Sequence, residues 1–393
     1  MNILFVTGDF AKDKRNTAMG GMALAVYKSA LGMKQLGHSV RILTLDKEDR
    51  RWTYKGLKVI SIQAKYGTDE NTILSSLYQI IKRESKIERT IKKLNRAECI
   101  DIIQYTGWYG IGLLHFSKIP AIMRVSSYTK VQLVHNYDGW KKRLLEIVEY
   151  LAAIRMNYIF APSRIMAKGL EFDIKKKVGI IETPFLKENI EWNDCILKTK
   201  LKDKKYILFF GRMSVDKGIF VIKDIIYKVL SKDSDIYFVF AGFSSVNALG
   251  VRIENELKDA AKEYGHRVLF LGPLSKDKLF PVINNAEVVL MPSLADNFPN
   301  SCAEAMSLGK IVIGTEGSSL EQFIKNKHNG FLVEIGNANS LCDCVESVLE
   351  MDDKEKKIIC EQAKKRIEKL SLERYSENMG KLYEKIIESD KHK

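Results

Sequence analysis

Short apolar segments alternate with longer amphipathic segments along the whole chain, and this alternation constrains the fold more than any other feature. It is typical of parallel sheets whose strands are joined by helices that cover the sheet. In the first half, a helix is expected near 22–36 and strands at 3–6, 40–45, 59–62, 100–104, 121–125 and 158–161. In the second half, strands are expected at 206–210, 236–241, 268–271, 288–291 and 311–315. We therefore predict an α/β protein with two Rossmann-like halves.

The chain has 393 residues, which is too long for one ordinary core and favours two domains of roughly 200 residues each. Polar residues and Pro184 predict a linker near 185–204. The expected domains are therefore 1–190 and 200–371. Residues 372–393 have apolar side chains at helical spacing, and we expect this helix to pack back on the first domain.

Composition predicts a cytoplasmic protein. No apolar run approaches the roughly 18 residues that span a bilayer, and the first strand begins without a signal-peptide pattern. The six cysteines contain no Cys-x-x-Cys pair, so free thiols and no structural zinc are expected. The net charge of +14 is concentrated in residues 1–195, where 32 Lys and Arg stand against 20 Asp and Glu.

Two cations flank glycines where the expected strand 206–210 gives way to a helix. The turn contains Gly211, Arg212, Lys217 and Gly218. Helix starts and basic side chains both favour anions, so this turn predicts a diphosphate site. The alternative is that both cations are solvated surface groups, as most Lys and Arg side chains are.

Asp296 and Glu304 lie eight positions apart, on either side of a turn that leads into a helix. Two acids so placed can hold the hydroxyls of a sugar nucleotide. Alternatively, Ser301 and Glu304 fit a capping box, and Asp296 beside Asn297 fits a turn. The combination with the two cations in one domain favours glycosyl transfer.

At these residues the chain resembles the retaining glycosyltransferases of the GT-B fold, of the family-four type (glycosyl transferases group 1). The second half is similar nearly throughout, at 211–218, 240–242, 270–272, 291–293, 304–309, 317–321 and 329–333. The first half is similar more loosely, at Gly20-Gly21, 36–40 and 161–163. The resemblance implies two Rossmann-like domains that face a central cleft.

The resemblance also implies the roles of the site residues. In the family, two glutamates separated by seven residues bind the donor. The second contacts ribose, and this role carries over to Glu304. The first lies near the donor sugar, and Asp296 occupies its position here. Arg212 and Lys217 would hold the leaving diphosphate. Further contacts to the nucleotide sugar are expected from Gly20, Gly21, Gly211, Leu274, Asn297, Phe298, Pro299 and Asn300.

Three departures from the family pattern bear on the donor sugar. Aspartate replaces the first glutamate at 296, which shortens the side chain by one methylene. Pro299 stands where many members have glycine. Ser126 and Ser127 occupy the region after strand 121–125 where many relatives have histidine. The sugar is therefore expected to be positioned differently from that of many relatives.

The resemblance implies a reaction that retains the anomeric configuration and needs no metal ion or other cofactor. In the mechanism commonly proposed for the family, a donor phosphate oxygen takes the acceptor's proton, while cations stabilise the charge on the departing phosphate. A carboxylate nucleophile is the alternative. The expected partners are a nucleotide-diphosphate sugar and a glycan or lipid-linked glycan acceptor, in bacterial surface polysaccharide synthesis.

The acceptor side is expected in the basic first half. Residues 72–97 fit a basic amphipathic helix on an anionic membrane, which would make the protein peripheral to the inner membrane face, or else a surface helix packed on the domain core. Tyr105, Trp108 and Tyr109 fit either an acceptor groove or core packing.

Three rival functions differ in class from a transferase. We expect no nucleic-acid partner, because no recognised binding module accompanies the positive charge. An NAD-dependent oxidoreductase also uses Rossmann-like domains, but residues 3–21 contain no Gly-x-Gly-x-x-Gly. A noncatalytic sugar-nucleotide-binding subunit stays open; a test of sugar transfer distinguishes it from an enzyme.

Overall fold

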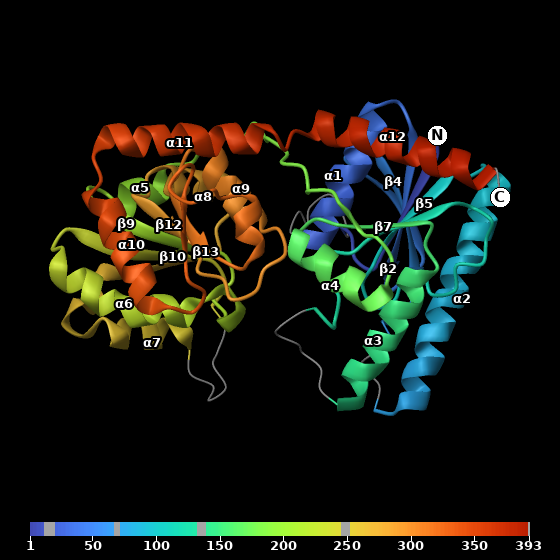
Figure 1. Cartoon of the computed structure of the whole chain (residues 1–393), viewed down its shortest axis with the longest axis horizontal. Coiled ribbons are helices and arrows are strands. Elements are labelled where there is room, and N and C mark those ends of the chain that lie inside the picture. Colours follow the sequence, from blue (N-terminus) through green and yellow to red (C-terminus); the bar gives the residue numbers. More distant parts are fainter. Residues whose placement is uncertain (12–19, 67–70, 132–138, 245–251, 392–393) are drawn as a thin grey trace. The chain divides into compact units, whose positions relative to one another are not determined.

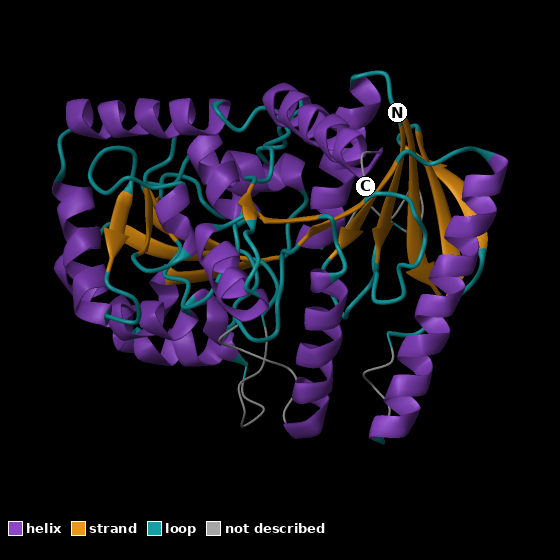
Figure 2. Ribbon diagram, turned by 45° about the vertical axis from the view of Figure 1, so that its right-hand side comes forward, coloured by secondary structure: helices purple, strands orange, loops and turns teal. Residues whose placement is uncertain are grey.

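The computed structural model describes residues 1–11, 20–66, 71–131, 139–244 and 252–391. Its contacts divide the chain into two compact units. Unit 1 consists of residues 1–186 and 370–393, and unit 2 of residues 187–369. In both units the strands lie between helices (Figures 1 and 2).

Unit 1 contains one sheet, which in its described residues runs in the order β3-β4-β2-β1-β5-β6-β7-β8. The strands are β1 (Asn2–Thr7), β2 (Ser39–Asp46), β3 (Arg50–Tyr54), β4 (Leu57–Gln63), β5 (Ile102–Thr106), β6 (Ala121–Arg124), β7 (Tyr158–Ala161) and β8 (Gly179–Ile180). The helices are α1 (Gly21–Gln35), α2 (Ile73–Ala97), α3 (Gly139–Ile154), α4 (Arg164–Ile174) and α12 (Leu372–Lys391). All neighbouring strands pair in parallel except β3 and β4. The carboxyl ends of the parallel strands therefore share one edge of the sheet.

Alternating side chains of β1 divide the core of unit 1 into two layers. Ile3 and Phe5 belong to an apolar cluster that includes residues of α1 and α12. Leu4 and Val6 belong to the cluster that includes residues of α2, α3 and α4. Because successive side chains of a strand point to opposite faces, this pattern covers the sheet on both sides.

The C-terminal helix α12 packs against α1, as the apolar spacing of the last residues predicts. Ser29 of α1 and Tyr375 of α12 are hydrogen-bonded at 2.7 Å, and both are buried. A side chain at Gly32 would meet Ser376, so this glycine permits close contact between the helices. The chain therefore returns to unit 1 after unit 2.

Unit 2 contains a parallel sheet, which in its described residues runs in the order β11-β10-β9-β12-β13-β14. The strands are β9 (Lys205–Phe210), β10 (Ile236–Ala241), β11 (Val268–Gly272), β12 (Val288–Leu290), β13 (Val312–Thr315) and β14 (Phe331–Val333). The α-helices are α5 (Cys195–Thr199), α6 (Ile219–Lys232), α7 (Ile253–Ala260), α8 (Lys276–Asn284), α9 (Asn300–Ser307), α10 (Ala338–Glu350) and α11 (Asp353–Glu368). The short 3-10 helices are η1 (Val215–Lys217), η2 (Lys262–Arg267) and η3 (Ser319–Gln322).

The strand order of unit 2 reverses direction between β9 and β12. From β9 the chain builds outward to β10 and β11, and then returns to place β12 on the other side of β9. The crevice at the carboxyl ends of strands beside such a reversal is the usual ligand site of open α/β sheets.

Most of the residues predicted to form a linker belong to unit 2. Helix α5 lies within the predicted 185–204 segment and contacts α8. Asn193 donates its backbone N–H to the carbonyl oxygen of Asp277 at 3.0 Å, and Glu188 pairs with Lys276 at 2.7 Å. The polar composition of the segment therefore reflects surface contacts with α8.

Candidate functional site

The predicted donor residues follow the two strands that flank the reversal point of unit 2. Gly211, Arg212 and Lys217 follow β9, and Asp296 follows β12. The two strands are neighbours, with Leu208 paired to Val289. The sheet therefore brings the predicted cations and the predicted acid to one edge.

The loop after β9 is hydrogen-bonded on both sides. Toward β10, Gly211 and Met213 donate their N–H groups to Ala241 and Phe243 at 2.9 Å. Toward β12, the carbonyl oxygen of Asp216 accepts the N–H of Leu294 at 2.9 Å. These bonds hold the loop in place before any ligand binds.

Glycines allow these loops to approach one another. Gly218 has φ +71°, and a Cβ there would lie 1.8 Å from the carbonyl oxygen of Pro292. Gly242 has φ +146°, and its Cβ would lie 1.8 Å from the carbonyl oxygen of Gly211. Gly211 itself has φ +126°, but no atom lies within 4 Å of its Cβ position. The backbone at Gly211 therefore has open space beside it, into which a ligand can come close.

Lys217 and Asp296 form an ion pair between the two loops. Their side chains are 27% and 13% exposed, so the pair is partly shielded from water. Arg212 pairs with Asp216 at 3.2 Å, but its side chain is 65% exposed. Asp216 was missed by sequence reasoning, although its i+4 spacing from Arg212 is a signal for such a pair.

The helix start near Lys217 differs from the prediction. Lys217 ends the 3-10 helix η1, and α6 begins only at Ile219, after the left-handed Gly218. The turn that contains Lys217 was predicted to lead directly into a helix, and a cation at a helix start opposes the helix dipole. Lys217 lies before that start, and its charge is balanced by Asp296.

The capping box proposed for Ser301 and Glu304 is wrong. Helix α9 is capped at Pro299 and begins at Asn300, with no side-chain capping bond. Ser301 is therefore already inside the helix. Glu304 is half-buried one turn later, on the helix that follows β12. Glu304 therefore does not occupy the capping position that the alternative assigned to it.

Phe298 has the left-handed φ of +63° in the turn between Asp296 and α9. This conformation is costly for a bulky residue, and all the more so before a proline. Ser319 accepts the N–H of Phe298 at 3.1 Å, and the ring of Phe298 packs on Phe323 with centroids 4.3 Å apart. These contacts stabilise the turn, so Phe298 fixes the conformation of the loop between Asp296 and α9. Asn297 and Asn300 flank this turn and are half-buried.

Other predicted contact residues belong to other segments of the chain. Leu274 follows β11, which is separated from β9 by β10. Gly20 and Gly21 belong to unit 1, where Gly20 is the N-cap of α1 and Gly21 its first residue. Ser126 and Ser127 follow β6, also in unit 1, and Ser126 is bonded to the buried Arg124.

Unit 1 combines a basic pocket with the predicted aromatic cluster. Tyr105 is a core residue, 1% exposed, whereas Trp108 and Tyr109 are half-buried and pack with Tyr66. Sequence reasoning missed a pocket of about 800 Å³ beside this cluster. Its lining comes from four separate segments, so no single motif marks it.

Helix α2 packs on the core of unit 1, which is one of the two alternatives considered for residues 72–97. Ile80, Ile87, Ile91 and Leu94 are buried in unit 1, as expected for a helix packed on the core. Ile73, Leu74, Tyr78 and Ile81 are exposed. The basic amphipathic pattern of residues 72–97 suggests that Arg83 faces the surface, but this is wrong: Arg83 is 1% exposed and pairs with the buried Glu84 at 2.9 Å.

The described residues include all the cysteines and most of the side chains that commonly bind metals. No group of three His, Cys, Asp or Glu side chains there is arranged to hold a metal ion. All six cysteines lie in this part of the chain and are unpaired. Cys302 of α9 is fully buried, and burial raises the pKa of its thiol.

Among the helices of the described residues, none has the length and apolar composition to cross a membrane.

Two family models match the chain, one in each unit. Residues 197–366 match the model of glycosyl transferases group 1. Residues 20–174 match the model of a glycosyl transferase 4-like domain. The first match includes Arg212, Lys217, Asp296 and Glu304, and the second includes Gly20 and Gly21.

Known proteins share this similarity over different lengths. A glycosyltransferase of Methanocaldococcus jannaschii, itself uncharacterised, is 23% identical over 364 residues, which are 89% of each chain. The lipopolysaccharide 1,2-N-acetylglucosaminetransferase of Salmonella typhimurium is 29% identical over 188 residues, 47% of this chain and 48% of the relative. The solved structure of HepE from Anabaena, in complex with UDP and glucose, aligns with a TM-score of 0.69 at 14% identity, over 98% of this chain and 100% of HepE. The chain belongs to the group 1 glycosyltransferases and has their GT-B fold, built from two parallel-sheet Rossmann-like units.

Proposed function

We propose that this protein is a retaining, metal-independent glycosyltransferase that moves a sugar from a nucleotide-diphosphate sugar to a glycan or lipid-linked glycan. The observation that carries the proposal is the Lys217–Asp296 ion pair at the reversal point of the unit 2 sheet. In the proposal, Lys217 is the cation for phosphate and Asp296 the acid for sugar hydroxyls, and backbone hydrogen bonds hold the two loops that carry them.

In the proposed reaction, the bond between the anomeric carbon and the diphosphate oxygen breaks, and the diphosphate leaves with the electron pair. Lys217 and Arg212 stabilise the negative charge that develops on it. The acceptor hydroxyl attacks from the same face and gives its proton to a donor phosphate oxygen. Asp296 orients the sugar, and Glu304 accepts hydrogen bonds from the ribose hydroxyls.

Relatives support the proposed classes of donor and acceptor. HepE is solved with UDP and glucose, which supports a uridine nucleotide as the first donor to test. The Salmonella relative acts on lipopolysaccharide, which supports a role in bacterial surface polysaccharide synthesis. Both assignments are transferred to this chain as proposals.

We also propose that α2 attaches the protein to an anionic membrane through its first turns. At 100° per residue, Ile73, Leu74, Tyr78 and Ile81 lie on one side of the helix, and all four are exposed. Lys82 and Arg89, which are also exposed, continue this surface with positive charge. Apolar side chains next to Lys and Arg suit the boundary between headgroups and acyl chains.

The transfer proposal is tested with a panel of nucleotide sugars and candidate acceptors, in the presence and absence of EDTA. We expect release of the nucleoside diphosphate, a product with the donor's anomeric configuration by NMR, and activity that survives EDTA. An inverted product or loss of activity with EDTA contradicts the proposed mechanism. Donor binding without transfer or hydrolysis favours the noncatalytic sugar-nucleotide-binding subunit.

The membrane proposal is tested by co-sedimentation with vesicles rich in phosphatidylserine. Leu74→Ser combined with Tyr78→Ser should reduce vesicle binding, while Lys82→Gln with Arg89→Gln should reduce it mainly at low salt. Lys34→Gln, on α1, is the control. No sedimentation of the unaltered protein at low salt removes the membrane from the proposal.

A further inference from the structure

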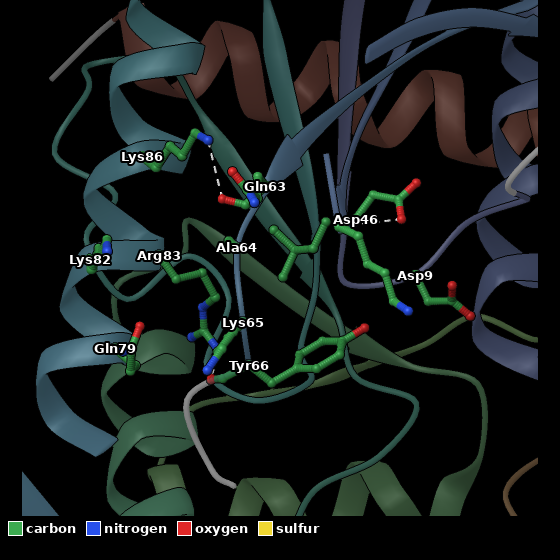
Figure 3. Close-up of a pocket in the computed structure, with 12 residues that line it drawn as sticks. Asp9, Asp46, Gln63, Ala64, Lys65, Tyr66, Gln79, Lys82, Arg83 and Lys86 are labelled. Atoms are coloured by element: carbon green, nitrogen blue, oxygen red, sulfur yellow. Dashed lines mark hydrogen bonds between the residues drawn. The ribbon is translucent and has the colours of Figure 1, made fainter. Parts of the chain in front are cut away.

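The pocket in unit 1 lies at the carboxyl ends of β1, β2 and β4, against one side of α2 (Figure 3). Asp9 follows β1, Asp46 ends β2 and Lys47 follows it, and residues 63–66 begin with the last residue of β4. Gln79, Lys82, Arg83 and Lys86 line it from α2. The carboxyl edge of a parallel sheet is the usual place for ligands, which makes this pocket a candidate site in its own right.

The charge of the lining is strongly positive. Five of the lining residues are basic and two are acidic. Ion pairs balance three of these charges. Lys86 pairs with Asp49 and Arg83 with Glu84. Asp46 pairs with Arg50. Over the whole lining the basic side chains therefore exceed the acidic ones by three, and two of the basic ones, Lys47 and Lys82, are exposed. Such an excess favours a ligand with more than one negative charge.

Buried groups hold the wall of the pocket in place. Arg83 donates to the carbonyl oxygens of Tyr66 at 2.6 Å and Tyr109 at 2.7 Å, while its Nε contacts Glu84. Lys86 donates to the carbonyl oxygen of Gln63 at 3.1 Å. These bonds tie α2 to the end of β4 and to the aromatic loop. The pocket is therefore built before a ligand arrives.

An aromatic surface adjoins the charged lining. Tyr66 lines the pocket, and its ring lies 5.0 Å from that of Tyr109 and 5.5 Å from that of Trp108. The Tyr66 hydroxyl donates to the carbonyl oxygen of Gly8 at 2.6 Å, and burial raises its pKa to about 12, so it stays neutral. Aromatic faces beside polar groups suit sugar rings as well as apolar chains.

We infer that this pocket binds the phosphate or diphosphate group of the acceptor substrate, with Lys47 and Lys82 as its main charged contacts. The inference rests on the proposed function and assigns the acceptor to phosphorylated compounds. A volume of about 800 Å³ exceeds the needs of one phosphate, so part of the attached sugar or lipid enters as well. The phosphate belongs either to a soluble sugar phosphate or to a lipid-linked diphosphate.

Calorimetric titration of the full chain with pyrophosphate, in saturating UDP, tests the inference. UDP occupies the proposed donor site of unit 2, so added pyrophosphate reports on other sites. We expect Lys47→Gln with Lys82→Gln to raise the pyrophosphate Kd at least about tenfold and to leave the UDP Kd unchanged. Lys93→Gln with Arg96→Gln is the matched control, because these exposed side chains of α2 lie outside the lining, and it should change neither.

Competition then identifies the source of the phosphate. Displacement of pyrophosphate by glucose 6-phosphate supports a soluble acceptor, and displacement by geranyl diphosphate supports a lipid-linked one. No pyrophosphate binding in saturating UDP, or binding that only Lys217→Ala weakens, overturns the inference. Failure of UDP to bind instead counts against the proposed donor site, so the two failures are distinguishable.

Discussion

Gly218 lies so close to Pro292 that a side chain on the glycine would overlap the proline's carbonyl oxygen. Gly218 separates the loop after β9 from α6, and Pro292 begins the loop after β12. The contact therefore joins the two segments that carry Lys217 and Asp296. It makes the geometry of the candidate site depend on a position that has no functional group.

Gly218→Ala should destabilise unit 2 by about 3 kcal/mol or more, because it adds strain at a positive φ and displaces backbone. Donor binding should weaken with it. Gly265→Ala is the control, since the nearest atom to its Cβ position is 3.5 Å away. Thermal unfolding and UDP titration measure both effects. Equal melting temperatures for the two variants would contradict the predicted overlap.

Lys217→Ala should lower the transfer rate by about a hundredfold while the free energy of unfolding changes by less than about 1 kcal/mol. The small stability effect follows from the partial exposure of the pair. Lys223→Ala breaks a comparable pair with Glu256, whose side chains are 31% and 22% exposed, and should leave the rate unchanged. Similar rates for both variants would place Lys217 outside the site.

Glu304→Gln should raise the Kd for UDP by about tenfold and change stability little, because a charged hydrogen bond to ribose becomes neutral. Ser301→Ala should affect neither quantity strongly, since Ser301 does not cap α9. Calorimetric titration and thermal unfolding of both variants decide the matter. Loss of stability in both, with unchanged UDP affinity, would restore the capping role.

Arg83→Gln should destabilise unit 1 by about 3–5 kcal/mol, because it leaves Glu84 buried without its cation. Lys82→Gln, at the neighbouring exposed position, should change stability by less than about 0.5 kcal/mol. Chemical denaturation of the two variants gives the comparison. Equal denaturation midpoints would show that the burial of Arg83 is wrong.

Glu149 of α3 should make stability depend on pH. It is buried, and its Oε2 accepts the N–H of Thr129 at 2.8 Å, while its Oε1 has no partner in the described residues. Burial raises its pKa from 4.5 to about 7. A raised pKa in the folded state stabilises the protein below pH 4.5, and this contribution is lost as the pH rises through about 7. The loss is about 3 kcal/mol.

Glu149→Gln should therefore be more stable than the unaltered protein at pH 8, and the difference should shrink toward pH 5. Glu388→Gln, an exposed change on α12, is the control and should show no such trend. Thermal unfolding between pH 5 and 8 gives the comparison. A constant difference across this range would mean that Glu149 does not titrate there.

The expected strands were predictable because buried parallel strands are short apolar runs with turns on both sides. Strand β3 was not predicted, since Arg50–Tyr54 carries two arginines and alternates between exposed and covered positions. It forms by pairing with β4 across Lys55 and Gly56, which both have positive φ. This is the geometry of a tight hairpin, but Lys-Gly is a weaker hairpin signal than Asn-Gly or Asp-Gly.

The candidate site was predictable residue by residue, but its contacts were not. The motifs mark Lys217 and Asp296, whereas their pairing depends on the adjacency of β9 and β12, which are far apart in sequence. Likewise, the basic pocket of unit 1 is lined by short segments that follow or end three strands and by one side of a helix. Three-dimensional proximity of this kind leaves no local pattern in the sequence.

The return of α12 to α1 affects how the two units mature during synthesis. Unit 2 is continuous in sequence, so it can fold as soon as residues 187–369 have left the ribosome. Unit 1 emerges earlier but must wait for α12, which at about 5–20 residues per second arrives roughly 10–40 s after residue 186. During that interval the surface of α1 that later contacts Tyr375 and Ser376 is uncovered. The first part of the chain to be translated is thus the last to be completed.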